Sequence, residues 1–310
     1  MEHGNPLMLC AKPITAVLAS GLQMVGCGQC INCTINKRRA WTARIMLEGL
    51  AAEKNHRQVS WTTLTYAEEA LPLAARGRGH EPSPTLRPGD YVLAFKRMRK
   101  PDVLGPFRFV LCGEYGDKFG RPHYHALIFG PDSHDVEAAL QRYWEPDFGH
   151  TRTRPWRAGE DIEANGTEVA LGRAAYVANY VTKKMNTQDA PKLGMVRDPE
   201  FFRCSRNPAI GWSQHLLDLC TTNGGSIEMA ETGDVPRSIR INKKQYPLAR
   251  VLREHLRDDL GIPQTVLERN QIITPLRERY QPTAEDYHRA AQTHAKIKRQ
   301  RAISANKANF

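Results

Sequence analysis

The chain has 310 residues, of which 25% are charged and 41% apolar, and its formal net charge is +11. This composition is ordinary for a globular protein that buries a full core, and a basic excess of this size favours an acidic partner such as nucleic acid over the alternative of a merely basic enzyme. Since no run of about 18 apolar residues occurs and no basic segment precedes a sustained apolar one, we expect neither a transmembrane helix nor a signal peptide.

Cysteines gather near the N-terminus. Cys27, Cys30 and Cys33 follow one another at regular spacing, Cys10 lies upstream, and the total of seven is odd. With no sign of secretion, a disulfide framework is not expected. Four thiolates can hold a structural zinc ion, but zinc ligands usually come as two separated pairs, so an iron–sulfur cluster and a group of reduced thiols stay open as alternatives.

The next elements combine strand composition with clustered positive charge. Residues 36–55 are predicted to form a helix with a basic first half, and residues 58–66 a strand. After a loop rich in proline, glycine and arginine, a helix over 91–100 ends in KRMRK before a proline. These charges suit a solvated face or a phosphate-binding one. The predicted DNA contacts are Lys37, Arg38, Arg39, Lys96, Arg97, Arg99, Lys100 and Arg121.

Two apolar segments, residues 107–115 and 123–129, are joined by a short polar turn and predict a hairpin. Side chains alternate along a strand, so His123 and His125 share one face. With a four-residue loop, His123 pairs with Glu114 across the hairpin, which brings this carboxylate to the imidazoles. Two imidazoles and a carboxylate on one face predict an open site for a divalent metal.

Both helices and strands are predicted after the hairpin. We expect helices over 133–143, 168–185, 213–221 and 248–260. We expect strands over 150–156, 201–204 and 237–241. From residue 284 the chain predicts a polar, basic helix that is either solvated or bound to nucleic acid.

The helix over 168–185 carries a second chemical element. Tyr176, Tyr180 and Lys184 are spaced four apart and so share one helix face, with Lys183 beside it. In isolation such tyrosines usually pack into a core. Near a divalent metal and a lysine, a phenol can act as a nucleophile on a phosphodiester.

Taken together, these motifs resemble a known group of enzymes. His123-Tyr124-His125 followed by Tyr180-x-x-Lys183 is similar to the His-hydrophobe-His endonucleases that initiate rolling-circle replication. The segment TLTY at 63–66 resembles their first motif. The segments CGQC, CGEYGDKFGRPHYHALIFG and AAYVANYVTKK look most like the replication initiation proteins of gokushovirus-type microviruses, which are small phages with single-stranded DNA. The likeness covers about residues 26–202.

The resemblance implies a role for each matching residue. His123 and His125 look like paired metal ligands, Glu114 like the third ligand, and Tyr180 like the nucleophile. Tyr176 completes a two-tyrosine arrangement in which one tyrosine holds the DNA 5′ end while the other cuts again. Lys183 occupies the position of the motif lysine, with Lys184 next to it.

The resemblance also implies an α+β fold: a central antiparallel sheet of ferredoxin or RRM type, flanked by helices and followed by a mostly helical C-terminal extension. We expect a cysteine-containing segment over 1–35, the endonuclease domain over 36–204 and a basic extension over 205–310. Mg²⁺ or Mn²⁺ is the expected cofactor, with Zn²⁺ at the cysteines.

The implied activity is nicking of one DNA strand at the origin through a 5′-phosphotyrosine intermediate. The implied partners are single-stranded and replicative-form phage DNA and the host polymerase and helicase, in the host bacterial cytoplasm and away from membranes. No glycine-rich nucleotide loop followed by Lys-Ser or Lys-Thr occurs, so we expect no built-in helicase. The alternatives are a plasmid relaxase or transposase of the same superfamily, and a non-catalytic zinc-containing protein that binds nucleic acid.

Overall fold

The computed structural model describes residues 9–18, 21–74, 82–116, 119–156, 174–175, 177–178, 197–221, 229, 232–241, 244–263, 284–285, 288–289, 291–292 and 295–296. The chain divides into two compact units, Arg44–Ser213 and Met1–Ala43 with Gln214–Phe310. Among the described helices, none combines the length and the apolar character needed to cross a membrane. The domain limits predicted at residues 35 and 204 stay a prediction.

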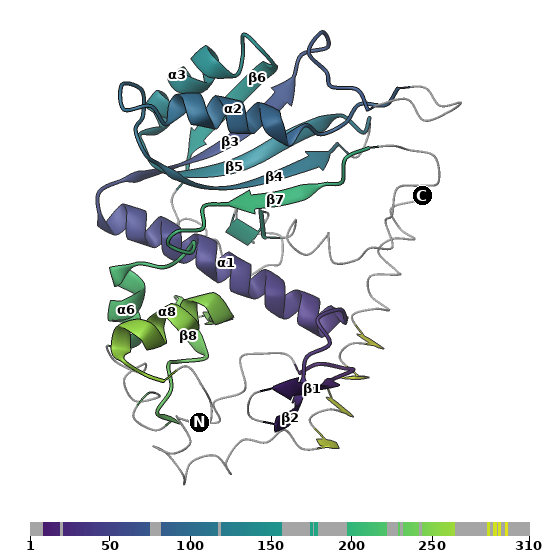
Figure 1. Cartoon of the computed structure of the whole chain (residues 1–310), viewed down its shortest axis with the longest axis vertical. Helices are drawn as coiled ribbons and strands as arrows, with labels where there is room; N and C mark the ends of the chain where they lie inside the picture. The colour runs from purple at the N-terminus through teal and green to yellow at the C-terminus, as the bar shows by residue number, and fades with distance from the viewer. Residues whose placement is uncertain are drawn as a thin grey trace. The chain divides into compact units, whose positions relative to one another are not determined.

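The unit Arg44–Ser213 is built on a five-stranded antiparallel sheet with the strand order β6-β3-β5-β4-β7 (Figure 1). The predicted α+β class is therefore confirmed. The central strands are rich in β-branched and aromatic residues, as a buried sheet requires. The strands are β3 (Gln58–Tyr66), β4 (Arg108–Tyr115), β5 (Pro122–Gly130), β6 (Gly149–Pro155) and β7 (Phe201–Cys204).

One face of this sheet is covered by α2 (Pro88–Met98) and α3 (Ser133–Tyr143), which Figure 1 shows on the same side. Leu64, Tyr66 and Tyr124 point to this side and join the hydrophobic core. The helix predicted over 91–100 starts earlier because Pro88 suits the first turn, where an N–H has no partner within the helix.

Tyr124 anchors that core through its hydroxyl group. The phenol oxygen accepts a hydrogen bond from the backbone N–H of Arg87 at 3.0 Å and lies 2.7 Å from the hydroxyl of Tyr66, which donates to Asp90 at 2.8 Å. Burial raises the pKa of Tyr124 to about 12, so the phenol stays protonated. The middle residue of the His-Tyr-His motif therefore serves the core, opposite the two histidines.

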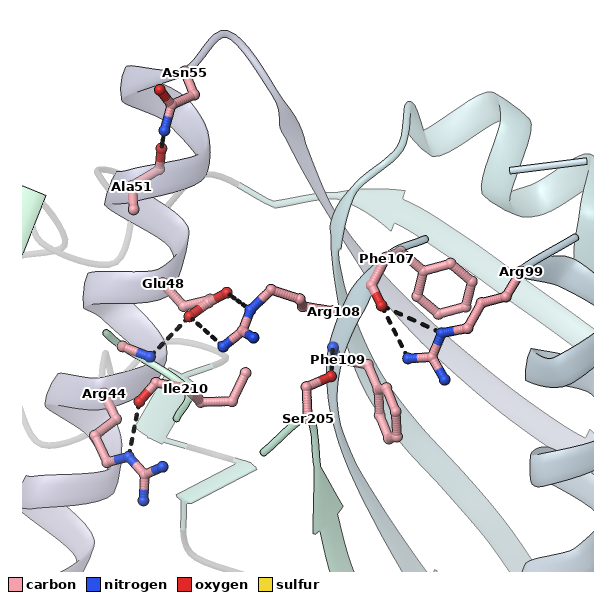
Figure 2. Close-up of polar contacts among 11 residues, drawn as sticks. Arg44, Glu48, Ala51, Asn55, Arg99, Phe107, Arg108, Phe109, Ser205 and Ile210 are labelled. Carbon is pink, nitrogen blue, oxygen red and sulfur yellow. Dashed lines mark hydrogen bonds and ion pairs between the residues drawn. The ribbon is translucent and has the colours of Figure 1, made fainter. Parts of the chain in front are cut away.

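The other face carries Arg108, which meets the second half of α1 (Ile31–Lys54), as Figure 2 shows. The buried carboxylate of Glu48 accepts hydrogen bonds from the Arg108 guanidinium and, at 2.8 Å, from the backbone N–H of Gly211. Arg44 donates from Nε to the Ile210 carbonyl at 2.9 Å. Gly211 has φ +85°, and a Cβ there would lie 2.8 Å from the Arg44 carbonyl oxygen, so the close approach needs glycine. This network fixes α1 beside the start of β4.

The other unit contains two hairpins and several helices. β1 (Ile14–Leu18) pairs with β2 (Gly21–Val25), and β8 (Ser238–Ile241) with β9 (Lys244–Pro247). The helices are the first part of α1, α6 (Gln214–Thr221) and α8 (Arg250–Leu260). The β1–β2 hairpin and strand β9 were not predicted, because such short strands with weak alternation are identified only by their pairing.

The start of α1 also differs from the prediction. The helix expected from residue 36 begins at Ile31, and the backbone N–H of Thr34 donates to the Cys30 carbonyl at 2.9 Å. The helix therefore begins inside the cysteine segment, so that Cys30 and Cys33 lie at its first turn.

Candidate metal centre

The β4–β5 hairpin has the register that the sequence predicts. Glu114 pairs with His123, Cys112 with His125, and Tyr115 with Pro122. The backbone N–H of Gly116 donates to the carbonyl of Arg121 at 3.0 Å and closes the turn. Because register determines which side chains share a face, this pairing places one carboxylate beside two imidazoles.

Glu114, His123 and His125 form a compact group, here called the triad. The Oε1 atom of Glu114 lies 2.9 Å from Nε2 of His123 and 2.9 Å from Nε2 of His125. The three possible ligand atoms all lie within 4.8 Å of one another. The side chain of Glu114 is 5% exposed, while those of His123 and His125 are 18% and 13% exposed. The triad is therefore held by the protein on one side and reachable from solvent on the other.

Each imidazole is oriented through its second nitrogen. The Nδ1 atom of His123 lies 3.1 Å from the carbonyl oxygen of Arg121, so it carries the proton and leaves Nε2 as an acceptor. The Nδ1 atom of His125 lies 3.0 Å from the hydroxyl of Thr63. The Trp61 ring stacks on His125 with a centroid distance of 5.2 Å. Such outer contacts orient ligands in metal sites.

The residue types of the triad fit a divalent cation. Two imidazole nitrogens and one carboxylate oxygen converge from one side and leave further coordination positions for water or substrate. Burial lowers the pKa of His123, but its contacts with the Glu114 carboxylate and the Arg121 carbonyl raise that pKa more, so the net shift is upward. The carboxylate would exert the same attraction on a metal ion.

Thr63 and Trp61 had not been recognised as site residues. Both lie on β3, where Thr63 pairs with His125 and Trp61 with Leu127. Alternation along β3 puts the two side chains on one face, but only the pairing of β3 with β5 shows that this is the face of the triad. The segment 63–66 does lie beside the metal strand, as its resemblance implies.

The four N-terminal cysteines also come together. Their Sγ atoms lie within 4.8 Å of one another, and those of Cys10 and Cys30 are 3.8 Å apart. Backbone N–H groups donate to three of the sulfur atoms: from Lys12 and Cys27 to Cys10 at 3.4 and 3.2 Å, from Cys30 to Cys27 at 3.3 Å, and from Cys33 to Cys30 at 3.5 Å. N–H donors of this kind stabilise thiolates.

The acidities of these thiols are shifted in opposite directions. Burial opposes ionisation of Cys27, but backbone N–H groups of Gln29 and Cys30 lower its pKa to about 7. Burial raises the pKa of Cys10 and of Cys33. All four are free thiols. One thiol that is ready to ionise, beside others that need a positive charge to do so, fits a metal ligand set.

The predicted nucleophiles Tyr176 and Tyr180 and the lysines Lys183 and Lys184 lie outside the described residues. Parts of the predicted helix around them are described: residues 174–175 and 177–178 are helical, and their side chains are buried. The roles of the two tyrosines and the two lysines stay predictions.

The predicted DNA contacts are spread over several surfaces. Arg121 forms an ion pair with Glu68 at 2.6 Å, and Arg97 one with Asp147 at 2.5 Å. Arg99 donates to the Phe107 carbonyl at 2.9 Å, and Arg39 to the Gln245 carbonyl at 2.6 Å. The basic residues of α2, including Lys96, belong to the layer that covers the sheet face opposite to the triad. Lys37 and Arg38 lie on α1, and Lys100 closely follows α2.

Comparison with known proteins gives a consistent relationship. Residues 59–185 match the model of a family described as Replication-associated protein ORF2. The chain is 30% identical over 188 residues to "Replication-associated protein ORF2" of Spiroplasma virus 4, which covers 59% of this chain and 54% of the relative. It is 32% identical over 178 residues to "Replication-associated protein VP4" of Bdellovibrio phage phiMH2K, with 53% and 50% covered.

A third relative, "Replication-associated protein ORF4" of Chlamydia phage 1, is 28% identical over 170 residues, with 51% of this chain and 38% of the relative covered. The chain thus spans about half the length of the first two relatives and less of the third. No solved structure matches. The resemblance to phage replication proteins is confirmed, and the matched family segment includes the whole triad.

Proposed function

Because residues 59–185 belong to the Replication-associated protein ORF2 family, as the resemblance to gokushovirus proteins led us to expect, we propose that this chain initiates rolling-circle replication. It would nick one DNA strand at the origin and later rejoin the ends. The observation that carries this proposal is the convergence of His123 and His125 on Glu114 at a partly exposed edge of the hairpin. Such a ligand set suits a cation that polarises a phosphate.

In the proposed reaction, the hydroxyl oxygen of Tyr180 attacks the scissile phosphorus. A bond forms between the phenol oxygen and phosphorus, the bond from phosphorus to the 3′ oxygen breaks, and the 3′ oxygen leaves as a hydroxyl with a proton. Mg²⁺ or Mn²⁺ held by the triad would polarise a phosphate oxygen and orient the group. Lys183 and Lys184 would offset the developing negative charge.

The phosphotyrosine keeps the energy of the broken bond, so rejoining needs no nucleotide. Tyr176 would cut the regenerated origin while Tyr180 holds the first 5′ end, and a final transfer would close a circle. The DNA partners would be single-stranded and replicative-form phage DNA. The host polymerase and helicase would extend the free 3′ hydroxyl in the bacterial cytoplasm.

The order of elements supports a ferredoxin-like or RRM-like core for this activity. β3, α2, β4, β5, α3 and β6 follow one another as strand, helix, strand, strand, helix and strand, which is the ferredoxin-like order. The strand β7 adds to the outer edge of β4. This arrangement places the metal hairpin in the middle of the sheet.

The proposal is tested with end-labelled single-stranded DNA from the replicon that encodes this chain. We expect cleavage with Mg²⁺ or Mn²⁺, none with EDTA, and a covalent DNA–protein adduct on a denaturing gel. A non-catalytic zinc-containing protein would bind the DNA without cutting it. A relaxase or transposase of the same superfamily would cut a different origin and would need only one tyrosine.

We further propose that Cys10, Cys27, Cys30 and Cys33 hold a structural zinc ion. Tetrahedral coordination with Zn–S bonds of about 2.3 Å places sulfur atoms about 3.8 Å apart, and the Sγ atoms of Cys10 and Cys30 have this separation. A disulfide would need about 2 Å. The ion would tie the start of α1 to the segment around Cys10, which is distant in the chain.

Zinc content and stability test this second site. We expect about one zinc per chain by mass spectrometry, and none in a Cys27→Ser, Cys30→Ser variant. The variant should also melt at a lower temperature, because zinc binding to such a site contributes about 10 kcal/mol to the folding of small zinc domains. The control Cys204→Ser changes a cysteine on β7 and should keep the zinc. Zinc-free native protein, or iron in its place, would refute the assignment.

A further inference from the structure

Strand β6 is an edge strand of the sheet and carries alternating side chains of two kinds. The hydroxyl of Thr153 lies 3.1 Å from that of Thr62, which is buried, and the hydroxyl of Thr151 donates to Glu145 just beyond α3 at 2.9 Å. These threonines therefore face the layer of α2 and α3. Because side chains alternate, His150, Arg152 and Arg154 face the opposite side, and all three are exposed.

The register extends this face to the triad. Thr63 pairs with Arg152 on one side and with His125 on the other, and Thr65 likewise pairs with His150 and His123. Residues paired across neighbouring strands lie on the same face. Arg152 is thus in the same cross-strand row as His125, two strands away, which corresponds to about 10 Å. Arg154 is in the next row, opposite Trp61.

Arg152 and Arg154 also differ from other arginines of this unit in their partners. Arg97, Arg108 and Arg121 each form an ion pair with a carboxylate. Within the part of the chain that the structure describes, neither Arg152 nor Arg154 forms one. An exposed guanidinium with no carboxylate partner can bind a phosphate through two N–H groups.

We propose that Arg152 and Arg154 bind the phosphates of the single DNA strand that leads to the triad. This inference rests on the proposed function, since it places the strand across the sheet from β6 to β5. The ligand is the phosphodiester backbone, so these contacts position the strand without reading its sequence. The basic residues of α2 belong to the opposite layer and would not touch this part of the strand.

The test measures binding separately from cleavage. Fluorescence anisotropy with labelled single-stranded oligothymidylate, in EDTA and at several salt concentrations, compares the native chain with an Arg152→Ala, Arg154→Ala variant. We expect affinity to fall roughly tenfold or more. The slope of log affinity against log salt should become shallower by about 1.4, since each single-strand phosphate contact contributes about 0.7. An Arg152→Lys, Arg154→Lys variant should keep most of the slope because it keeps both charges.

The control variant Arg57→Ala, Arg142→Ala removes the same charge from exposed positions before β3 and on α3, and should bind as the native chain does. If the native chain cleaves its origin DNA but the Arg152, Arg154 double variant binds with unchanged affinity and slope, the inference is wrong. If the native chain does not cleave but the double variant loses binding as expected, the inference stands and the proposed nicking is wrong. Equal melting temperatures establish that all variants are folded.

Discussion

Replacing His125 by alanine should reduce metal-dependent nicking by about a thousandfold or more. The triad supplies two imidazole nitrogens and one carboxylate oxygen, and loss of one ligand removes much of the charge stabilisation of the transition state, which is worth several kcal/mol. The measurement is single-turnover cleavage of labelled origin DNA with Mn²⁺. Glu114→Gln should have a similar effect, because an amide keeps the shape of the side chain and loses its charge.

A graded series makes this test specific. Thr63→Ala removes the hydroxyl that lies 3.0 Å from Nδ1 of His125, and loss of such an outer contact typically costs about 10- to 100-fold. The matched control is Thr65→Ala, on the same strand and the same face, because its hydroxyl donates to the His150 carbonyl at 3.3 Å and not to a ligand of the triad. It should cleave at nearly the native rate. A folded His125→Ala variant with native activity would rule out the triad as the metal centre.

The double variant Tyr176→Phe, Tyr180→Phe should form no covalent adduct with DNA. Phenylalanine keeps the ring but has no oxygen that could bond to phosphorus, so the loss should be complete and not merely a reduction. The measurement is a denaturing gel of protein incubated with labelled origin DNA and Mn²⁺. Mass spectrometry of the digested native adduct then identifies the modified tyrosine.

The single variants assign the two roles. Tyr180→Phe should abolish the first cut if Tyr180 attacks first, whereas Tyr176→Phe should permit the first cut and block the second transfer. Tyr143→Phe at the end of α3 is the control and should form the adduct normally. A native yield of adduct from the double variant would mean that another group is the nucleophile, and the proposed mechanism would be wrong even if cleavage depended on the triad.

Several features of this protein follow from its sequence alone. The short turn between β4 and β5, together with the two-residue repeat of a strand, was sufficient to predict that Glu114 pairs with His123 and that His125 shares its face. The grouping of Cys27, Cys30 and Cys33 was visible in the same way. These features are predictable because they depend on residues a few positions apart, whose geometry is determined by turn length and backbone repeat.

Other features required the tertiary structure. Nothing near His125 in the chain indicates that Thr63 and Trp61 contact it, or that Arg152 continues its row. Likewise, the sequence does not show that Cys10 reaches the other three cysteines, or that α2 covers the face opposite to the triad. Local segments thus determined the ligands and the hairpin that carries them. The surroundings of the ligands were decided by which distant strands pair and which face each helix buries, because these choices minimise the exposed apolar surface of the whole unit and not of any one segment.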